Sequence, residues 1–217
     1  VLREAKAYTR ARDRFINAVT DFGFVGDWDT VTGRGTDNYP AMQALSDSLL
    51  AEWGAPTTIL IPAGDYRTSQ MWFLDANVVE VEADLGATIR TTAATWLGGV
   101  VGFMGGGLLG VEPGNPEGNA ALTPMRERFV WKGGKVIAAG SGDLDCGLGV
   151  TRVRNAHISD VTAEADRHPI TAQYAIHNLV IERCEIPRAG IDGVQLLSDV
   201  KRATIRDIHV VQAGAHA

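Results

Sequence analysis

Acidic side chains and one histidine recur in the C-terminal half of the chain at a spacing suited to glycoside chemistry. Asp145, His168 and Asp192 follow one another at intervals of 23 and 24 residues. If each interval is one coil of a solenoid, strand spacing of about 4.8 Å places the two carboxylates about 9.6 Å apart, with the histidine between them. Inverting glycosidases hold their carboxyl groups about 6.5–9.5 Å apart, which leaves room for water. The spacing therefore predicts a general acid and a general base, with a histidine that orients one of them.

Two further acids stand close to this column. Asp143 and Asp166 each precede it by two residues, and as neighbours they would raise one another's pKa, so that one becomes a proton donor. No cofactor and no metal is assigned to the site. The predicted catalytic residues are Asp145, Asp192, His168, Asp166 and Asp143.

Two other interpretations of these residues stay open. Asp is common in turns for local reasons, and the turns of a solenoid stack whether or not they do chemistry. Alternatively, Arg167 or Arg188 would act as the base of an elimination reaction, opposite calcium held by carboxylates.

The composition excludes several classes of protein. The 217 residues correspond to one large or two small domains, at about 150 residues each. Twenty Lys and Arg against 26 Asp and Glu leave a net charge of −6, which argues against nucleic acid or an anionic membrane surface as a partner. No apolar stretch reaches the roughly 18 residues of a membrane span, and two cysteines make no disulfide framework.

A repeat of about 23 residues decides the expected fold. Ile158, Ile181 and Ile205 align at intervals of 23 and 24 residues. A unit of this length is shorter than the roughly 30 residues of a βαβ unit, but it suits one coil of a parallel β-solenoid. The positions five before, three after and five after each Ile are also apolar or small: Val153, Ile176, Val200, Val161, Cys184, Ile208, Ala163, Ile186 and Val210.

Polar columns support the same stacking. Two residues after each aligned Ile stand Asp160, Arg183 and Asp207, an acid–base–acid series that parallel strands in register would place side by side. Asn155 and Asn178 share another column, as in an asparagine ladder. We therefore expect an all-β solenoid.

The N-terminal half supplies the elements that begin the stack. An amphipathic helix is predicted from about 37 to 53, where it would cover the open hydrophobic end of the first coil. Strand-like stretches follow at 57–61 and 77–89, and a further coil fits at 129–137. The residues from 98 to 124 are rich in Gly and Pro and are predicted to form a long loop.

The two ends of the chain differ from the repeat. Residues 1–16 are basic and are predicted to form an exposed helical or anchoring segment, with the solenoid spanning 17–217. No second cap follows the last coil. We therefore expect the N-terminal part of a longer protein, or another chain that covers the exposed end.

Three segments carry a resemblance to a known family: VTDFGFVGD at 19–27, GTDN at 35–38 and ILIPAGDY at 59–66. They resemble the opening of pectate-lyase-like right-handed parallel β-helix proteins, whose usual pattern is DFGAxGDGxTDDTxAIQxA followed by VxIPxGxY. That superfamily includes polygalacturonases, rhamnogalacturonan-active enzymes and phage tailspike depolymerases. The resemblance covers 17–90 by motif and 127–214 by repeat. It implies a right-handed parallel β-helix with an N-terminal capping α-helix.

The resemblance is less informative about the reaction, because one fold hosts many chemistries. The loop at 28–32 is longer than the pattern, and Asn38 replaces its second acid. Asp21, Asp27 and Asp37 are interpreted as structural residues. The Asn-Thr-Asp, Asp-Asp, Gly-His-Gly and Arg-Ile-Lys segments of polygalacturonases do not occur here in order, which argues against a standard polygalacturonase.

Two functions follow from the resemblance and the acidic column. The first is a protein that binds and degrades a polysaccharide, as a glycoside hydrolase or lyase, of phage tailspike-like or secreted depolymerase type. The alternative is a non-catalytic structural or adhesive virion spike built on the same β-helix. Either would be extracellular or virion-associated, with a polysaccharide as partner, and either would form a homotrimer or attach to a larger assembly through residues 1–16.

Overall fold

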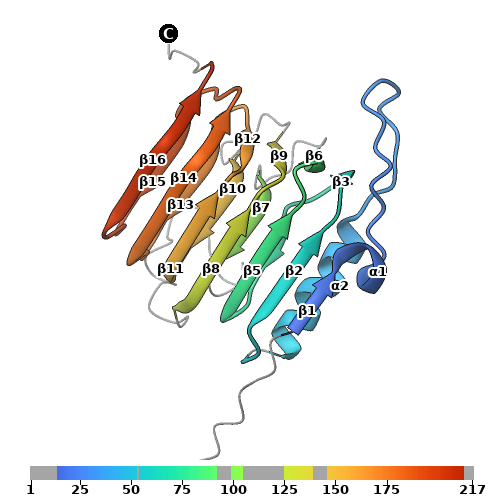
Figure 1. Cartoon of the computed structure of the whole chain (residues 1–217), viewed down its shortest axis with the longest axis horizontal. Helices are drawn as coiled ribbons and strands as arrows, with labels where there is room; N and C mark the ends of the chain where they lie inside the picture. The colour runs from blue at the N-terminus through green and yellow to red at the C-terminus, as the bar shows by residue number, and fades with distance from the viewer. Residues whose placement is uncertain (1–13, 53, 92–98, 105–124, 139–145, 213–217) are drawn as a thin grey trace, which may run out of the picture.

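The computed structural model describes residues 14–52, 54–91, 99–104, 125–138 and 146–212. In these residues the chain forms a parallel β-solenoid of about five turns (Figure 1). This confirms the all-β solenoid expected from the repeat. The right-handed sense of the coil stays a prediction.

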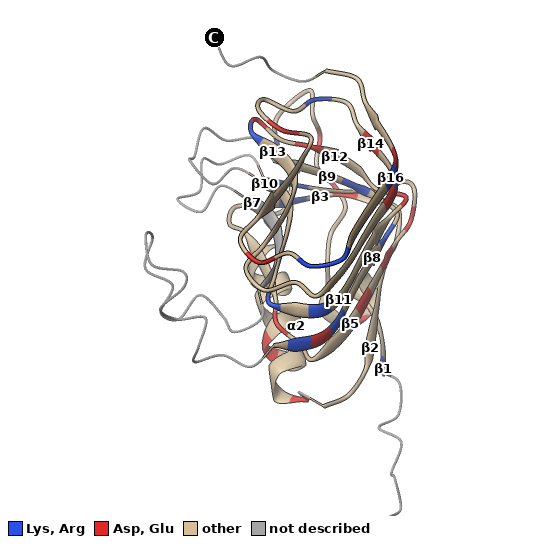
Figure 2. Cartoon of the chain, turned by 90° about the vertical axis from the view of Figure 1, so that its left-hand side faces the viewer, with Lys and Arg blue, Asp and Glu red and all other residues tan. Residues whose placement is uncertain are grey.

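Each coil contributes strands to two sheets, which Figure 2 shows on opposite sides of the coils. The 11-stranded sheet contains two arms that meet at β14. Its first arm contains β1 (Arg14–Asn17), β2 (Thr57–Ile61), β5 (Val78–Ala83), β8 (Arg126–Lys132), β11 (Val153–Ser159), β14 (Asn178–Ile186) and β16 (Ala203–Val210). Its second arm contains β3 (Gly64–Thr68), β6 (Ala87–Thr91), β9 (Lys135–Ala138) and β12 (Thr162–Glu164). The 5-stranded sheet contains β4 (Trp72–Leu74), β7 (Gly99–Met104), β10 (Cys146–Thr151), β13 (His168–Gln173) and β15 (Val194–Leu197).

The aligned isoleucines form one column of the hydrophobic core. Ile158 pairs with Ile181, and Ile181 pairs with Ile205, as the repeat predicted. The same column continues through all the earlier coils, and its inner members are 0–2% exposed: Ile16, Ile59, Val81, Trp131, Ile158 and Ile181. Ile205 is 43% exposed because β16 is the last described strand of this arm.

Two segments differ from the sequence-based expectation. Arg14–Asn17 is the strand β1, paired in parallel with β2, so part of the segment predicted to be helical belongs to the solenoid. Gly99–Met104 is the strand β7, paired with β4 and β10, although it lies in the segment predicted to be a loop. In both cases pairing with strands of neighbouring coils determines the extended backbone conformation. The local amino-acid composition does not indicate this pairing. Residues 1–13 and 105–124 lie outside the described part.

The predicted N-terminal helix is α2 (Tyr39–Ala51), preceded by the short α1 (Ala18–Phe22). Both lie beside β1 and β2 at the N-terminal end of the stack (Figure 1). Met42, Leu45 and Leu49 of α2 are buried in the same core as the strands. The indole nitrogen of Trp72 in β4 donates to the carbonyl of Met42 at 3.1 Å. The helix is therefore packed on the first coils, while its role as a cap stays a prediction.

The residues of the family-like motifs hold turns together. Both Asp27 carboxylate oxygens accept from Thr36 at 2.8 Å, one from the backbone and one from the hydroxyl group. Asp37 accepts from the backbone N–H groups of Tyr39 and Ser69, at 3.2 and 2.9 Å. These contacts agree with a structural role for the motif acids. The described residues include no helix long and apolar enough to cross a membrane.

Candidate functional site

The predicted site residues that the structure describes lie around β13 and β15, in the last coils of the 5-stranded sheet. In β13, Ile170 and Ala172 are fully buried in the core. Because side chains alternate along a strand, Thr171 belongs to the outer side of the sheet. It pairs with Gly149 on one side and Gln195 on the other. This outer side of β13 and β15 is called the outer sheet face below.

Thr171 is a buried polar side chain in an unusual position. It is only 5% exposed, and its Oγ1 atom has no hydrogen-bond partner among the described residues. A buried hydroxyl without a partner costs free energy, so such groups are rare in folded proteins.

His168 is the first residue of the same strand, and its ring contacts two side chains of the following coil. Its Nδ1 atom lies 3.5 Å from Asp192 Oδ2. Its Nε2 atom lies 3.2 Å from Gln195 Nε2. The imidazole, only 8% exposed, therefore lies between a carboxylate and an amide of the next coil.

The other described acid of the predicted site, Asp166, is held by an arginine. Its Oδ1 atom lies 2.7 Å from Arg188 NH1, in an ion pair between consecutive coils. Gly190, in the next coil, lies directly against the backbone of Asp166. A Cβ atom at Gly190 would lie 1.6 Å from the Asp166 carbonyl oxygen. The structure therefore brings together His168 and Asp192, and separately Asp166 and Arg188. Asp143 and Asp145 lie outside the described residues.

The register corrects the column that the sequence spacing proposed. Cys146, not Asp145, pairs with His168. The corner between β10 and β11 contains one residue, Arg152, between Thr151 and Val153. The next corner contains two, Tyr174 and Ala175, both with positive φ. Counting backwards from Ile158 therefore misses the register by one residue. The corners that follow β13 and β15 both contain two residues, 174–175 and 198–199, so counting backwards from Ile181 and Ile205 gives positions in register, His168 and Asp192. The catalytic roles of the five residues stay predictions.

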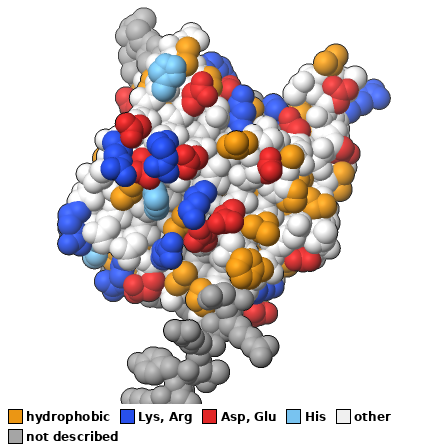
Figure 3. All heavy atoms as spheres, viewed as in Figure 1, with side chains coloured by type: hydrophobic (Ala, Val, Ile, Leu, Met, Phe, Trp, Pro, Cys, Tyr) orange, Lys and Arg blue, Asp and Glu red, His pale blue; other side chains and the backbone are white. Residues whose placement is uncertain are grey.

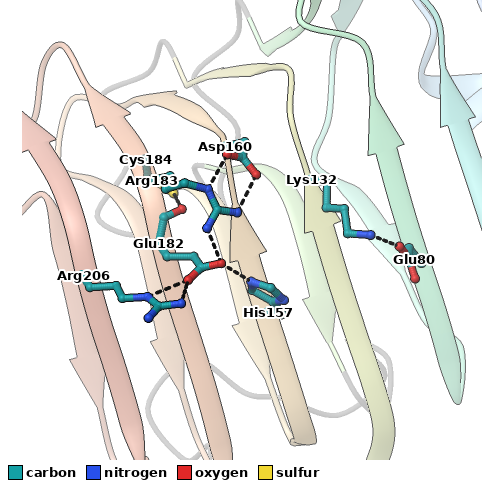
Figure 4. Close-up of polar contacts among 8 residues, drawn as sticks. All are labelled: Glu80, Lys132, His157, Asp160, Glu182, Arg183, Cys184 and Arg206. Atoms are coloured by element: carbon teal, nitrogen blue, oxygen red, sulfur yellow. Dashed lines mark hydrogen bonds and ion pairs between the residues drawn. The ribbon is translucent and has the colours of Figure 1, made fainter.

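A second polar cluster, which the sequence only partly indicated, lies on β11, β14 and β16 (Figure 4). Arg183 donates to both carboxylate oxygens of Asp160, at 2.7 and 2.9 Å, as the acid–base column predicted. Glu182, only 5% exposed, accepts from Arg206 Nε at 2.7 Å and from Arg183 NH1 at 2.5 Å. His157 Nε2 lies 3.2 Å from the same carboxylate.

These contacts change the acidity of Glu182. Its hydrogen bonds to Arg206 and then Arg183 lower its pKa to about 2, because both cations favour the charged carboxylate. Nothing in the 23-residue repeat pointed to Glu182, since it acts through neighbours in two other coils. Figure 3 shows charged side chains gathered over these C-terminal coils. We interpret the cluster as a clamp between coils.

The asparagine column is also confirmed. Asn155 pairs with Asn178, and Asn178 Nδ2 donates to Asn155 Oδ1 at 2.8 Å. Within the described residues, no group of three or more His, Cys, Asp and Glu side chains could hold a metal ion.

Comparisons with known proteins place this geometry in a wider context. The sequence matches no protein-family model. It also matches no curated protein. Among solved structures, the chain is similar to PfbA, a surface adhesin of Streptococcus pneumoniae, with a TM-score of 0.54 and 15% sequence identity. The match covers 82% of this chain and 40% of the adhesin chain. At this identity the similarity shows the shared fold alone, and membership of the pectate-lyase-like superfamily stays a prediction.

Proposed function

We propose that the chain is the ligand-binding solenoid of an extracellular or cell-surface adhesive protein, and that it holds a polysaccharide on the outer sheet face without cleaving it. The solenoid provides a rigid lateral surface, and the fold is similar to that of a protein described as a surface adhesin. The adhesive alternative is favoured over degradation by the arrangement around His168.

The observation that supports this proposal most directly is the contact of His168 with Gln195. Nε2 faces the amide at 3.2 Å and Nδ1 faces Asp192 at 3.5 Å, and the ring is only 8% exposed, so both nitrogens are directed at neighbouring side chains and not at open solvent. The partly exposed Gln195 and the exposed Asp192 then present polar groups suited to sugar hydroxyls. Sites of this kind bind through a few placed polar groups on a preformed surface.

Polysaccharide degradation is the second candidate function, and one observation favours it. His168 Nδ1 faces Asp192 Oδ2 at 3.5 Å, the arrangement by which a carboxylate orients an imidazole. A depolymerase, secreted or of tailspike type, would need a second carboxylate, and Asp145 is the predicted one. A homotrimeric state and attachment through residues 1–16 also stay predictions.

The test is a panel of neutral and acidic polysaccharides, each examined for binding and for cleavage with the same protein. Retarded migration of the protein in gels containing a polysaccharide measures binding. New reducing ends measure hydrolysis, and ultraviolet absorbance of an unsaturated product measures elimination. The proposal expects retardation by at least one polysaccharide and no product from it. A product from any retarding polysaccharide would replace the adhesive function with the degradative one.

A further inference from the structure

A partly exposed tyrosine stands at the corner where β13 ends. Tyr174 directly follows Gln173, the last residue of that strand. The other two tyrosines of the described residues, Tyr39 and Tyr66, each donate a hydrogen bond through the hydroxyl group, at 3.3 and 2.9 Å. The side chain of Tyr174 makes no hydrogen bond and no aromatic contact within the part of the chain that the structure describes. Its ring and hydroxyl group are therefore available to a ligand.

The backbone of this corner does not favour a tyrosine. Tyr174 and Ala175 have φ values of 55° and 59°, in the left-handed region. Ser198 and Asp199 form the equivalent corner of the next coil, with φ values of 44° and 58°. Short polar side chains tolerate this region because they can hydrogen-bond locally, whereas a bulky side chain is strained there. Strained residues of this kind cluster at ligand sites, so the tyrosine is a candidate for a binding role.

The neighbours of Tyr174 on the outer sheet face add uncharged groups. Gln173 lies two residues after Thr171 and therefore on the same side of the sheet, and its side-chain amide has no partner among the described residues. It pairs with Leu197 of β15, which is 40% exposed. Ser198 follows Leu197 and is exposed, with a hydroxyl group that has no described partner either. An aromatic ring, an amide, a hydroxyl group and an apolar side chain thus stand together where β13 and β15 end.

The charged residues of these corners are engaged within the protein. Asp199 Oδ1 lies 3.2 Å from Lys201 Nζ. Arg152, the single corner residue of the preceding coil, has an interaction of its own. The groups left for a ligand are therefore uncharged. They suit the C–H face and the hydroxyl groups of a neutral sugar, whereas a polyanion such as a nucleic acid would need cations for its phosphate groups.

We propose that Tyr174, Gln173 and Ser198 form a sugar subsite, in which a pyranose ring of a neutral polysaccharide stacks on the tyrosine and hydrogen-bonds to the amide and the serine hydroxyl group. This inference rests on the proposed function, and it adds the chemical class of the ligand and one place of contact. The subsite lies at the end of β13 opposite to His168. Five residues separate the two ends, about 17 Å along a strand, so a polysaccharide can reach both and a single sugar cannot.

The test measures the retardation of the whole chain in gels that contain a polysaccharide. Soluble β-glucan, galactomannan and dextran are the neutral probes, and polygalacturonate is the acidic one. Tyr174→Asn is the test variant, because asparagine tolerates the left-handed backbone and removes the ring. Tyr39→Asn is the matched control, since Tyr39 is also partly exposed but belongs to α2.

We expect Tyr174→Asn to weaken binding of the neutral probe that retards the unmodified chain most by about tenfold, because the stacking surface is lost. Tyr39→Asn should change this binding less than about twofold, and Tyr174→Phe, which keeps the ring, less than about threefold. Urea denaturation of the same variants checks folding. Tyr174→Asn should unfold at an equal or higher urea concentration, because it relieves the strain at this corner.

Two results would overturn the subsite and leave the proposed function standing. One is undiminished binding of the neutral probe by Tyr174→Asn, and the other is retardation by polygalacturonate alone.

Other results reach further. A fall of both binding and urea midpoint in Tyr174→Asn would make the tyrosine a structural residue. Tighter binding of a single-stranded oligonucleotide than of any neutral probe, lost in Tyr174→Asn, would assign the ring to base stacking and overturn the sugar subsite. No retardation of the folded chain by any probe would overturn the subsite and the proposed function together, whereas release of sugar products would overturn the proposed function alone.

Discussion

His168 Nδ1 lies 3.5 Å from Asp192 Oδ2, and the two residues belong to consecutive coils of the solenoid. β13 and β15 pair in parallel, which keeps the two residues in one column. The opposite ring nitrogen of His168 lies 3.2 Å from Gln195 Nε2. The imidazole is therefore held between two side chains of the next coil, as a group that fixes the shape of a binding face.

Thr171→Val tests the cost of the buried hydroxyl group. Valine keeps the shape and removes a polar group that has no described partner. We expect the free energy of unfolding to rise by about 1 kcal/mol, because an unpaired buried hydroxyl group is lost. Urea denaturation measures this change, and a fall in stability would mean that the hydroxyl group has a structural partner.

Asp192→Asn tests the degradative alternative. The carboxylate side chain is 54% exposed and makes a long contact, so its loss should change the free energy of unfolding by less than about 0.5 kcal/mol. In the adhesive account, neither the unmodified protein nor the variant releases sugar products. Cleavage that is present in the first and absent in the second would establish Asp192 as a catalytic residue.

Glu182→Gln should weaken the clamp between β11, β14 and β16. The pKa of this carboxyl is lowered from 4.5 to about 2 by Arg206 and Arg183. A lowered folded-state pKa gives stability that is present above pH 4.5 and is lost as the pH falls towards about 2. We expect the variant to have a lower Tm at neutral pH and a shallower loss of Tm on acidification.

The matched control for this clamp is Glu185→Gln, an exposed residue of the same strand. Thermal unfolding followed by circular dichroism between neutral and acidic pH distinguishes the two variants. Equal acid sensitivity of Glu182→Gln and the unmodified chain would contradict the role of the clamp.

Gly26→Ala tests the packing of the N-terminal segment on the first coil. A Cβ atom at Gly26 would lie 2.8 Å from the Gly64 Cα atom, which is backbone and does not move easily. We expect a loss of about 1–3 kcal/mol in the free energy of unfolding. Gly54→Ala, where a Cβ atom meets nothing within 4 Å, should change it by less than about 0.5 kcal/mol. Similar urea midpoints for the two variants would show that the close approach does not limit stability.

The sequence predicted the solenoid because its core is periodic. Ile158, Ile181 and Ile205 form one column, and the asparagine pair stands as expected. Apolar side chains at fixed intervals indicate which residues share a face of the sheet. The repeat was therefore sufficient to predict the solenoid fold.

The site was harder to predict, because corner length does not follow from the core columns. Two residues lie between Gln173 and Ile176, whereas one residue lies between Thr151 and Val153. Because of this difference, Cys146 and not Asp145 pairs with His168. Glu182 was missed for a different reason. Two of its partners, His157 and Arg206, come from other coils and become neighbours only through the register.

The measurement that tests the central claim most directly is size-exclusion chromatography with light scattering on a mixture of the chain and a polysaccharide that retards it. The account predicts that the protein elutes with the polymer after prolonged incubation and that the molar mass of the polymer does not change. A falling polymer mass would contradict binding without cleavage, and protein that elutes alone in the presence of every polysaccharide would contradict binding itself.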